Sequence, residues 1–221
     1  MSAAMLIRGM FHHVSDRPQP GTGTFPPDWL VSSFLPAAVR KVRLDSLSAA
    51  SQPVFPAPTG YWSFNDRGET FTADLSGAGH AGFLQGGVTY VAGHSGQPSD
   101  FAVQLNGSNA AVTTAVPLLD GKDAYTMTGW VNFTATQRDR TGFFGLNDAI
   151  EFGMNTATSI ELWSPTGGAI QTPFGPSSNG WRHIAVVADA TGRRIYIDGV
   201  LVASGPVGTP TASPGFNFNM G

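Results

Sequence analysis

The sequence predicts an all-β protein, a two-sheet antiparallel β-sandwich preceded by a Pro-rich, mostly irregular N-terminal arm. Three observations lead to this prediction. Glycine and proline, which punctuate a chain with turns, are frequent, with 28 Gly and 16 Pro among 221 residues. Charged residues make up only 12% of the chain, which argues against a charged coiled coil or a typical helical bundle. Several short segments alternate apolar and polar residues, as half-buried strands do.

The clearest strand signal lies at residues 125–133. Tyr125, Met127 and Val131 share one face of this segment, whereas Trp130 and Asn132 share the other. Further strands are expected at residues 61–65, 82–91, 101–105, 110–114, 142–146, 159–163, 181–188, 194–198 and 200–203, with an Asp-Gly turn joining the last two. We expect Arg193 and Arg194 at a solvated strand start, and no helix longer than two turns after residue 60.

Residues 1–57 form the predicted arm and linker, and residues 58–221 the β-domain. Prolines at 18, 20, 26 and 27 keep part of the arm extended. The arm is too apolar to be an inert tail. It is also too short, and too often interrupted by proline, to hold a core of its own. We therefore expect it to anchor the chain on other subunits. The alternative is an extension that wraps around its own domain.

Charge and cysteine content exclude several classes of protein. The net charge is −3 and no basic cluster exceeds Arg40, Lys41 and Arg43, so a nucleic-acid partner is not expected. The chain has no cysteine, which excludes disulfides and thiolate metal sites. No signal peptide is visible, and no apolar stretch approaches the roughly 20 residues of a membrane span.

A set of motifs along residues 58–221 resembles a known family. The motifs are Tyr61-Trp-Ser-Phe64, Asp74-Leu-Ser-Gly-Ala-Gly-His-Ala-Gly82, Gly93-His-Ser-Gly96, Val103-Gln-Leu-Asn-Gly-Ser-Asn109, Tyr125-Thr-Met-Thr-Gly-Trp-Val131, Trp181-Arg-His-Ile-Ala-Val-Val187 and Arg194-Ile-Tyr-Ile-Asp-Gly-Val-Leu-Val-Ala203. Their order and spacing resemble the laminin-G-like, concanavalin A-like jelly roll of many bacterial and phage surface proteins. The resemblance implies the fold, but this fold hosts lectins, adhesins, glucanases and structural modules alike.

The sequence departs from this family at its C-terminal end. Family members usually continue into a closing strand with a Gly-x-Ile/Leu-Asp-Glu/Asp pattern, whereas this sequence stops at Phe216-Asn-Phe-Asn-Met-Gly221. Either this sequence is a fragment, or other residues or another chain complete the sheet. If the closing strand is missing, we expect an open sheet edge that pairs with another chain.

No catalytic residues are expected. Laminarinase-type enzymes of the resembling fold carry a Glu-x-Asp-x-x-Glu strand, and hydrolysis with retention needs two carboxyl groups about 5 Å apart. The nearest match is Leu146-Asn-Asp148-Ala-Ile-Glu151, in which Leu146 replaces the first Glu. The sequence therefore predicts a protein that is not an enzyme.

Two binding sites are predicted. Asp74 precedes a Gly-rich turn, which predicts a Ca²⁺ ligand; the alternative is an Asp that caps a hairpin. Trp130, Asn132, Glu161 and Trp163 are the glycan-binding candidates, because aromatic rings stack on sugars and polar neighbours bind hydroxyl groups. The alternative places both tryptophans in the core or at its rim.

Two functions remain open. The first is a structural and binding module displayed on a larger assembly such as a phage virion, as a decoration, fibre or tail-associated protein with its jelly roll outward for glycan or host-surface binding. The second is a secreted or cell-surface carbohydrate-binding adhesin or lectin. The expected location is accordingly a virion, the extracellular space or a cell surface.

Overall fold

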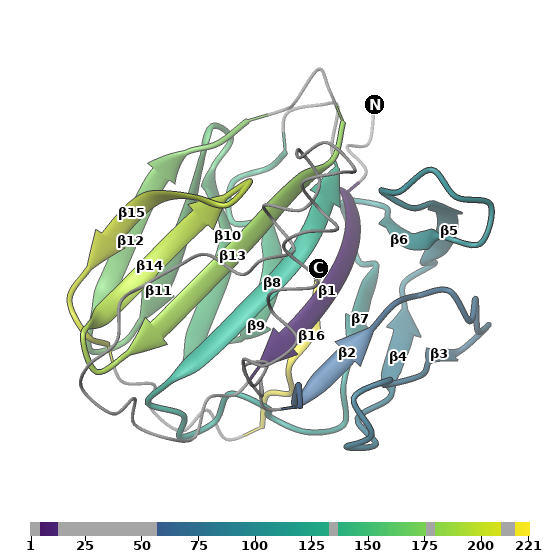
Figure 1. Cartoon of the computed structure of the whole chain (residues 1–221), viewed down its shortest axis with the longest axis horizontal. Coiled ribbons are helices and arrows are strands. Elements are labelled where there is room, and N and C mark those ends of the chain that lie inside the picture. Colours follow the sequence, from purple (N-terminus) through teal and green to yellow (C-terminus); the bar gives the residue numbers. More distant parts are fainter. Residues whose placement is uncertain (1–4, 13–56, 133–136, 176–179, 209–214) are drawn as a thin grey trace, which may run out of the picture. The chain divides into compact units, whose positions relative to one another are not determined.

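Sixteen β-strands and no helix occur among the residues that the structure, a computed structural model, describes: 5–12, 57–132, 137–175, 180–208 and 215–221. The strands form two antiparallel sheets, as predicted (Figure 1). The expected strands are present, except that residues 82–91 form two strands, 82–85 and 89–92, in different sheets. The strands at 5–12, 71–72, 150–156, 168–173 and 219–220 are additional. Within the described ranges, no helix is long and apolar enough to cross a membrane.

Each sheet contains eight strands. Sheet A has the order β15 (Val200–Gly205), β14 (Gly192–Ile197), β13 (Arg182–Asp189), β8 (Tyr125–Asn132), β1 (Met5–His12), β6 (Phe101–Leu105) and β5 (Thr89–Ala92), with β2 (Gly60–Trp62) paired to β1. Sheet B has the order β12 (Gly168–Pro173), β11 (Ser159–Ser164), β10 (Ile150–Thr156), β9 (Gly142–Leu146), β16 (Asn219–Met220), β7 (Ala111–Thr113), β4 (Gly82–Gln85) and β3 (Phe71–Thr72).

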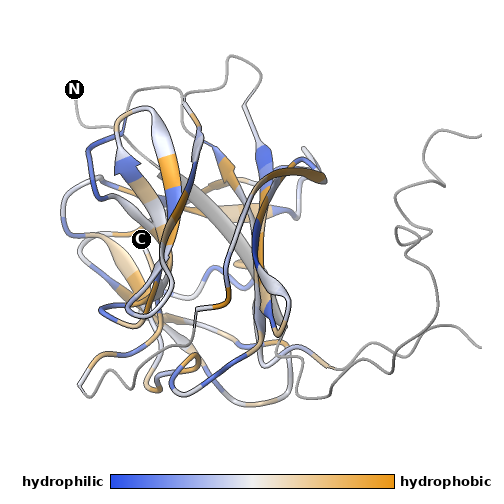
Figure 2. Cartoon of the chain, turned by 90° about the vertical axis from the view of Figure 1, so that its left-hand side faces the viewer, coloured by the Kyte–Doolittle hydropathy of each residue, from blue (hydrophilic) through white to orange (hydrophobic). Residues whose placement is uncertain are grey.

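The core lies between the two sheets. Along β8, buried and half-buried residues alternate strictly, and the buried set contains Tyr125, Met127 and Val131, the face that the sequence predicted. β11 contributes Ile160 and Leu162 from the opposite sheet in the same way. Figure 2 shows this alternation of hydrophobic and hydrophilic residues along the strands. The outward residues of the two sheets therefore face opposite sides of the sandwich.

β1 places part of the predicted arm inside sheet A. β8 pairs with one edge of β1 along Leu6–His12, and the other edge is shared by β6, at Met5–Ile7, and β2, at Gly9–Phe11. The predicted boundary after residue 57 therefore does not hold for residues 5–12. No hairpin pattern predicts β1, because its partners β2, β6 and β8 all lie far along the chain. Residues 13–56 lie outside the described part of the chain, so their anchoring role stays a prediction.

β16 lies inside sheet B, and the open edge of a missing closing strand stays a prediction. Asn219 and Met220 pair with β9 on one side and with β7 on the other. The amide of Gly221 donates to the carbonyl oxygen of Phe143 at 3.1 Å, which extends the contact with β9. Sheet B is therefore continuous from β12 to β3. A two-residue strand escaped prediction because it is too short to show alternation.

The two sheets are also joined by a buried arginine. Arg193 on β14 is fully buried, in contrast to the solvated position expected from the sequence. Its guanidinium donates to the carbonyl oxygens of Gly168, at 2.8 Å, and Pro206, at 3.0 Å, and to the hydroxyl of Ser164, at 3.1 Å. These acceptors satisfy much of the donor capacity that burial would otherwise leave unpaired. Arg193 thus connects sheet A to the β11–β12 hairpin of sheet B.

The role of the C-terminal residues can be tested with a pair of phenylalanines. Phe218 is fully buried and stacks on Trp62, with ring centroids 6.0 Å apart, whereas Phe216 is 45% exposed. We expect Phe218→Ala to lower the free energy of unfolding by about 3–5 kcal/mol, because it leaves a cavity in the core. Phe216→Ala is the matched control and should change it by less than about 1 kcal/mol. Equal effects in denaturant unfolding would contradict the placement of these residues.

Candidate functional site

The four predicted glycan-binding residues lie on two different faces. Glu161 and Trp163 point outward from β11 in sheet B, and both are half-buried. Trp130 and Asn132 point outward from β8 in sheet A and are also half-buried. Because the core separates the outer faces of the two sheets, these four residues do not form one site.

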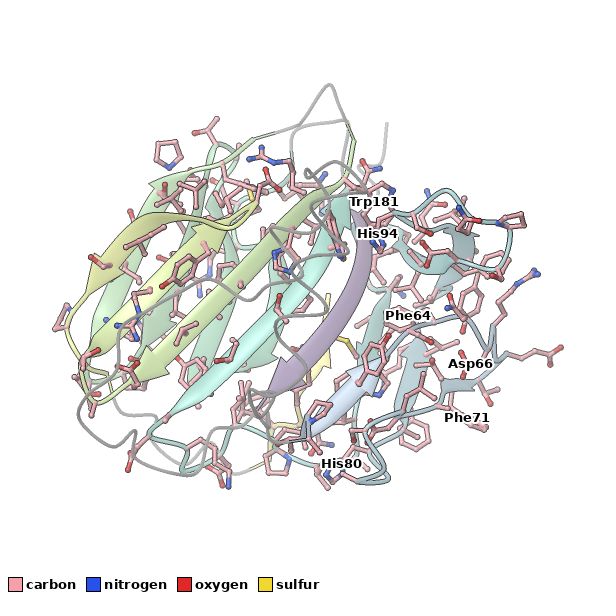
Figure 3. All side chains as sticks on the ribbon, viewed as in Figure 1. Phe64, Asp66, Phe71, His80, His94 and Trp181 are labelled. Atoms are coloured by element: carbon pink, nitrogen blue, oxygen red, sulfur yellow. The ribbon has the colours of Figure 1, made fainter. Side chains whose placement is uncertain are left out.

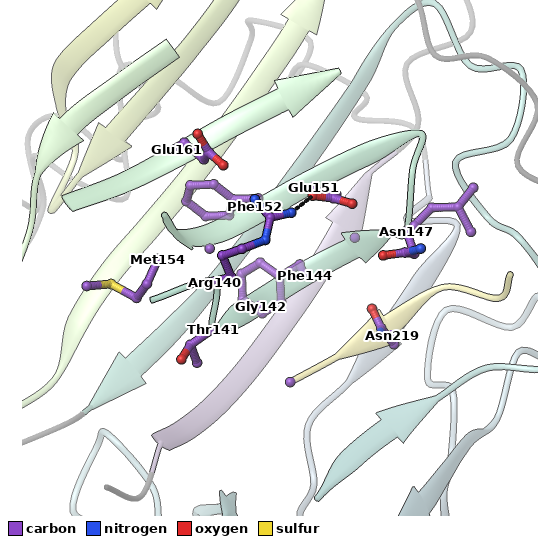
Figure 4. A pocket seen from close by; sticks show the side chains of 14 residues that line it. Arg140, Thr141, Gly142, Phe144, Asn147, Glu151, Phe152, Met154, Glu161 and Asn219 are labelled. Atoms are coloured by element: carbon purple, nitrogen blue, oxygen red, sulfur yellow. Dashed lines mark hydrogen bonds and ion pairs between the residues drawn. The ribbon is translucent and has the colours of Figure 1, made fainter. Parts of the chain in front are cut away.

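A pocket of about 270 Å³ lies on sheet B, between β9, β10, β11 and β16 (Figure 4). Its polar side chains are those of Arg140, Thr141, Asn147, Glu151, Glu161 and Asn219. This volume is just below the roughly 300–1,000 Å³ typical of ligand pockets, which suits a small polar molecule or one unit of a longer chain.

Glycines keep the floor of this pocket free of side chains. A Cβ atom at Gly145 would lie 2.5 Å from the carbonyl oxygen of Ile150, and one at Gly153 would lie 2.3 Å from that of Thr141. Since real Cβ atoms do not approach backbone oxygens so closely, only glycine fits at these positions. Gly142 also lines the pocket. A planar ligand can therefore come close to the sheet.

The charged groups of the pocket have a net charge of −1, from two glutamates and one arginine. A guanidinium nitrogen of Arg140 lies 3.4 Å from Glu151 Oε2, and the Arg140 side chain is 73% exposed. The other oxygen of Glu151 accepts the amide of Asp148 at 3.0 Å. Glu161 instead accepts a hydrogen bond from the neutral amide of Gln171 at 3.2 Å. Each carboxylate is thus held in place by a hydrogen bond, and the partner of Glu161 is a neutral amide.

Trp163 lies next to the pocket. It is the cross-strand partner of Glu151 in the β10–β11 pair, and directly opposite residues of antiparallel strands point to the same face. The sequence identified Glu161 and Trp163 but missed Arg140, Asn147, Glu151 and Asn219 as parts of a common site. The β10–β11 hairpin register would have found Glu151. Asn219 reaches the pocket because β16 pairs with β9, a long-range contact that no local sequence pattern reveals.

Trp130 is part of an aromatic cluster on sheet A. The imidazole of His94 stacks on its ring, with centroids 4.2 Å apart, and His183 meets it edge-on at 5.2 Å. Trp181 lies beside His94, as Figure 3 shows. Burial lowers the pKa of His183; His94 adds to this shift and Asp198 opposes it. One face of the Trp130 ring is therefore already covered by protein.

Asn132 also lies away from the pocket. Its amide oxygen is buried and has no hydrogen-bond partner among the described residues. The roles predicted for Trp130 and Asn132 in glycan binding thus stay predictions, with a site on sheet A separate from the pocket on sheet B.

Asp74 caps the loop that follows it. Its Oδ1 accepts the amides of Tyr61 and Ser76, each at 2.9 Å. Its Oδ2 accepts the hydroxyl of Ser76 at 2.8 Å and the amide of His80 at 2.9 Å. Burial would raise the pKa of Asp74, but these hydrogen bonds outweigh it and lower the pKa below the usual 3.8. This geometry is that of the hairpin cap, the alternative to a calcium ligand.

The described residues contain no group of three or more His, Asp or Glu side chains arranged to hold a metal ion. Calcium binding at Asp74 stays a prediction, and the four donors that already occupy its oxygens weigh against it. We expect the midpoint of thermal unfolding to be the same in Ca²⁺ and in EDTA, because the oxygens of Asp74 already accept four hydrogen bonds. A tightly bound calcium ion would instead raise the midpoint in Ca²⁺. A lower midpoint in EDTA would instead support the calcium site.

Asp74→Asn is the companion variant for this test. In this variant an NH₂ group replaces one of the two oxygens that accept hydrogen bonds from Ser76, His80 and Tyr61, so some of these donors lose their acceptor. The variant should therefore lower the free energy of unfolding by about 1–3 kcal/mol at neutral pH, with or without calcium. Because the folded pKa lies below the unfolded one, the stability contributed by Asp74 is complete above the unfolded value and is lost as pH falls through the folded one. The difference in the free energy of unfolding between Asp74→Asn and the parent should therefore become smaller in acid.

Comparison with known proteins agrees with the fold. A laminin-G-like family model, described as the concanavalin A-like lectin/glucanases superfamily, matches residues 106–221, more than half of the chain. Among solved structures, domain 4 of AbnA, a GH43 extracellular arabinanase from Geobacillus stearothermophilus, is similar with a TM-score of 0.52 and 19% identity, over 74% of this chain and 82% of that one. That structure is a complex with arabinotriose. A search of curated proteins gives no match. With two antiparallel sheets around one core and this family match, the chain belongs to the concanavalin A-like lectin/glucanase superfamily.

Proposed function

We propose that the chain binds a neutral carbohydrate in the pocket of sheet B. The observation that carries the proposal is a side-chain-free glycine floor framed by carboxylate and amide groups. A sugar ring is flat enough to approach such a floor, and its hydroxyl groups lie around its rim. The carboxylate and amide groups around the pocket can therefore form hydrogen bonds with the hydroxyl groups around the sugar ring.

The polar groups of the pocket offer both kinds of hydrogen bond. Glu151 and Glu161 accept hydrogen bonds from hydroxyl groups, Arg140 donates them, and the amides of Asn147 and Asn219 do both. Sugar hydroxyl groups also donate and accept, so neighbouring hydroxyls can pair with different groups of this set. The aromatic ring of Trp163, beside Glu151, adds an apolar surface for the C–H face of a sugar.

The charge of the pocket favours neutral sugars over acidic ones. Arg140 already pairs with Glu151, and Glu161 has only a neutral partner. A uronic acid carboxylate placed near Glu161 would meet a like charge, which costs free energy at short distance. Neutral pentoses and hexoses avoid this repulsion.

We further propose that the chain binds its glycan without cleaving it. In the segment nearest to the catalytic pattern, Leu146 is fully buried and Asp148 sits in an exposed turn. Asp148 does not line the pocket, so Glu151 is the one carboxylate that this segment contributes to it. The AbnA domain, a part of an arabinanase in complex with arabinotriose, supports a binding role by its similar fold.

The setting of the domain is a separate proposal. We infer display on a larger assembly such as a phage virion, anchored through the N-terminal arm, with a secreted or cell-surface adhesin as the alternative. The Pro-rich composition of residues 13–56 and the position of this segment between two adjacent strands support it. Phe11 of β1 pairs with Gly60 of β2, so the arm leaves and re-enters the sandwich at one point.

Glycan binding is tested by titration calorimetry with neutral arabino-, xylo- and β-gluco-oligosaccharides and with oligogalacturonate. We expect one neutral series to bind and Glu161→Ala to weaken it about tenfold or more, because a hydrogen bond to a charged group is lost. Asp123→Ala, which removes an exposed carboxylate away from the pocket, is the matched control. Tighter binding of oligogalacturonate, or unchanged affinity in a folded Glu161→Ala protein, would contradict the proposal. Product analysis of the same mixtures tests for cleavage.

The arm is tested by replacing residues 13–58 with Asn-Gly, a turn that joins antiparallel strands in a two-residue loop. Because Phe11 and Gly60 are already paired, we expect the shortened protein to keep its melting midpoint and its glycan affinity. Sedimentation should show that the full chain associates and the shortened chain does not. Identical sedimentation of the two proteins would overturn the anchoring role.

A further inference from the structure

We propose that the carbohydrate site continues from the pocket across sheet B to Phe83 and Phe71, so that its ligand is a linear chain of neutral sugar units lying across the strands. This inference rests on the proposed function and adds the length and direction of the ligand. It also assigns a binding role to two aromatic residues that the pocket does not include.

Strand register defines the path. Glu151 lies opposite Gly145, Gly145 opposite Asn219, and Asn219 opposite Thr113. Thr113 in turn lies opposite Phe83, and Phe83 opposite Phe71. Directly opposite residues of antiparallel strands share a face, so these six residues form one row perpendicular to the strands.

The row lies on the outer face of sheet B. The residues next to its members along the strands, Phe152, Phe144, Met220, Val112 and Thr72, are all at most 2% exposed. Side chains alternate between faces along a strand, so the row itself points away from the core. Phe71 marks the end of the row at β3 (Figure 3). With Trp163 opposite Glu151 at the other end, aromatic residues flank a polar centre.

Phe71 and Phe83 are exposed without a structural reason. They are 51% and 46% exposed, although they are direct cross-strand partners. This pair is smaller than the exposed apolar patches that mark interaction sites by themselves, so its significance comes from the polar row that continues from it. Two half-exposed phenylalanines offer about 200 Å² together, far less than the roughly 800 Å² that each partner of a stable protein complex buries. That area suits one or two sugar rings instead.

The spacing of the strands sets the length of the ligand. Neighbouring strands are about 4.8 Å apart, so β4 lies about 14 Å from β9 and about 19 Å from β10. The spacing is close to the rise per unit of an extended pentose or hexose chain. A chain with one unit in the pocket would therefore reach Phe83 with its fourth or fifth unit, and Thr113 and Asn219 would contact the units between.

The test is a length series of the neutral oligosaccharides used above, from two to about eight units, titrated into the full chain. We expect affinity to rise with length until the chain reaches Phe83 and Phe71, and then to level off. Phe83→Ala should weaken binding of the long oligosaccharides roughly three- to tenfold and leave the short ones unchanged. Leu201→Ala on sheet A, where Leu201 is 50% exposed, is the control and should change neither.

The outcomes separate this inference from the proposed function. If short oligosaccharides bind but length and Phe83→Ala have no effect, the extended path is wrong and the pocket remains. If Phe83→Ala weakens short and long chains equally in a folded protein, Phe83 is not a distant contact and the inference also fails. If no neutral oligosaccharide of any length binds, the proposed function itself fails. Phe83 and Phe71 are exposed, so the variants should fold as the parent does.

Discussion

Sheet B depends on two residues near the end of the sequence. Asn219 and Met220 fill the space between β9 and β7, and without them the ladder would separate into β12–β9 and β7–β3. An unfilled gap would expose backbone N–H and C=O groups on both flanking strands, which is costly unless water or another chain satisfies them. β16 also does more than pair. Its inward residue, Met220, is fully buried in the core, and its outward residue, Asn219, lines the pocket. The same short strand thus supports the fold and the candidate site.

The pocket follows from the way β9 and β10 pack. Their backbones approach so closely at Gly145 and Gly153 that no side chain fits, and glycine in a strand sacrifices packing and conformational entropy. A sheet can accept this loss where the inner face compensates. Here Phe144 and Phe152 lie opposite each other on the inner face and bury their rings in the core. The result is a strand pair with large side chains inside and a bare surface outside, which is the arrangement that a flat ligand requires.

The sequence predicts what is local and misses what is long-range. The alternation at 125–132 and 159–163 correctly groups the residues that share a face, but it left open whether Trp130 and Trp163 face the core or the outside; the structure places both outward. Which sheet each strand joins depends on β8 pairing with β1 and β13, and on β11 pairing with β10 and β12, and no local pattern contains that information. The two tryptophans therefore looked like one site and lie on opposite faces. Arg193 and Arg194 show the same limit, because two adjacent arginines differ in burial only through alternation relative to a core that other strands create.

The strands that flank residues 13–59 and the candidate site belong to different sheets. β1 and β2, between which residues 13–59 run, are both strands of sheet A, whereas the pocket and the aromatic row lie on sheet B. The chain therefore leaves and re-enters the sandwich through one sheet and presents its proposed glycan surface on the other. Shortening the segment between β1 and β2 thus alters sheet A, whereas the pocket and Phe83 variants alter sheet B. Because each kind of variant changes a different sheet, association and glycan binding can be measured as separate properties of the same protein.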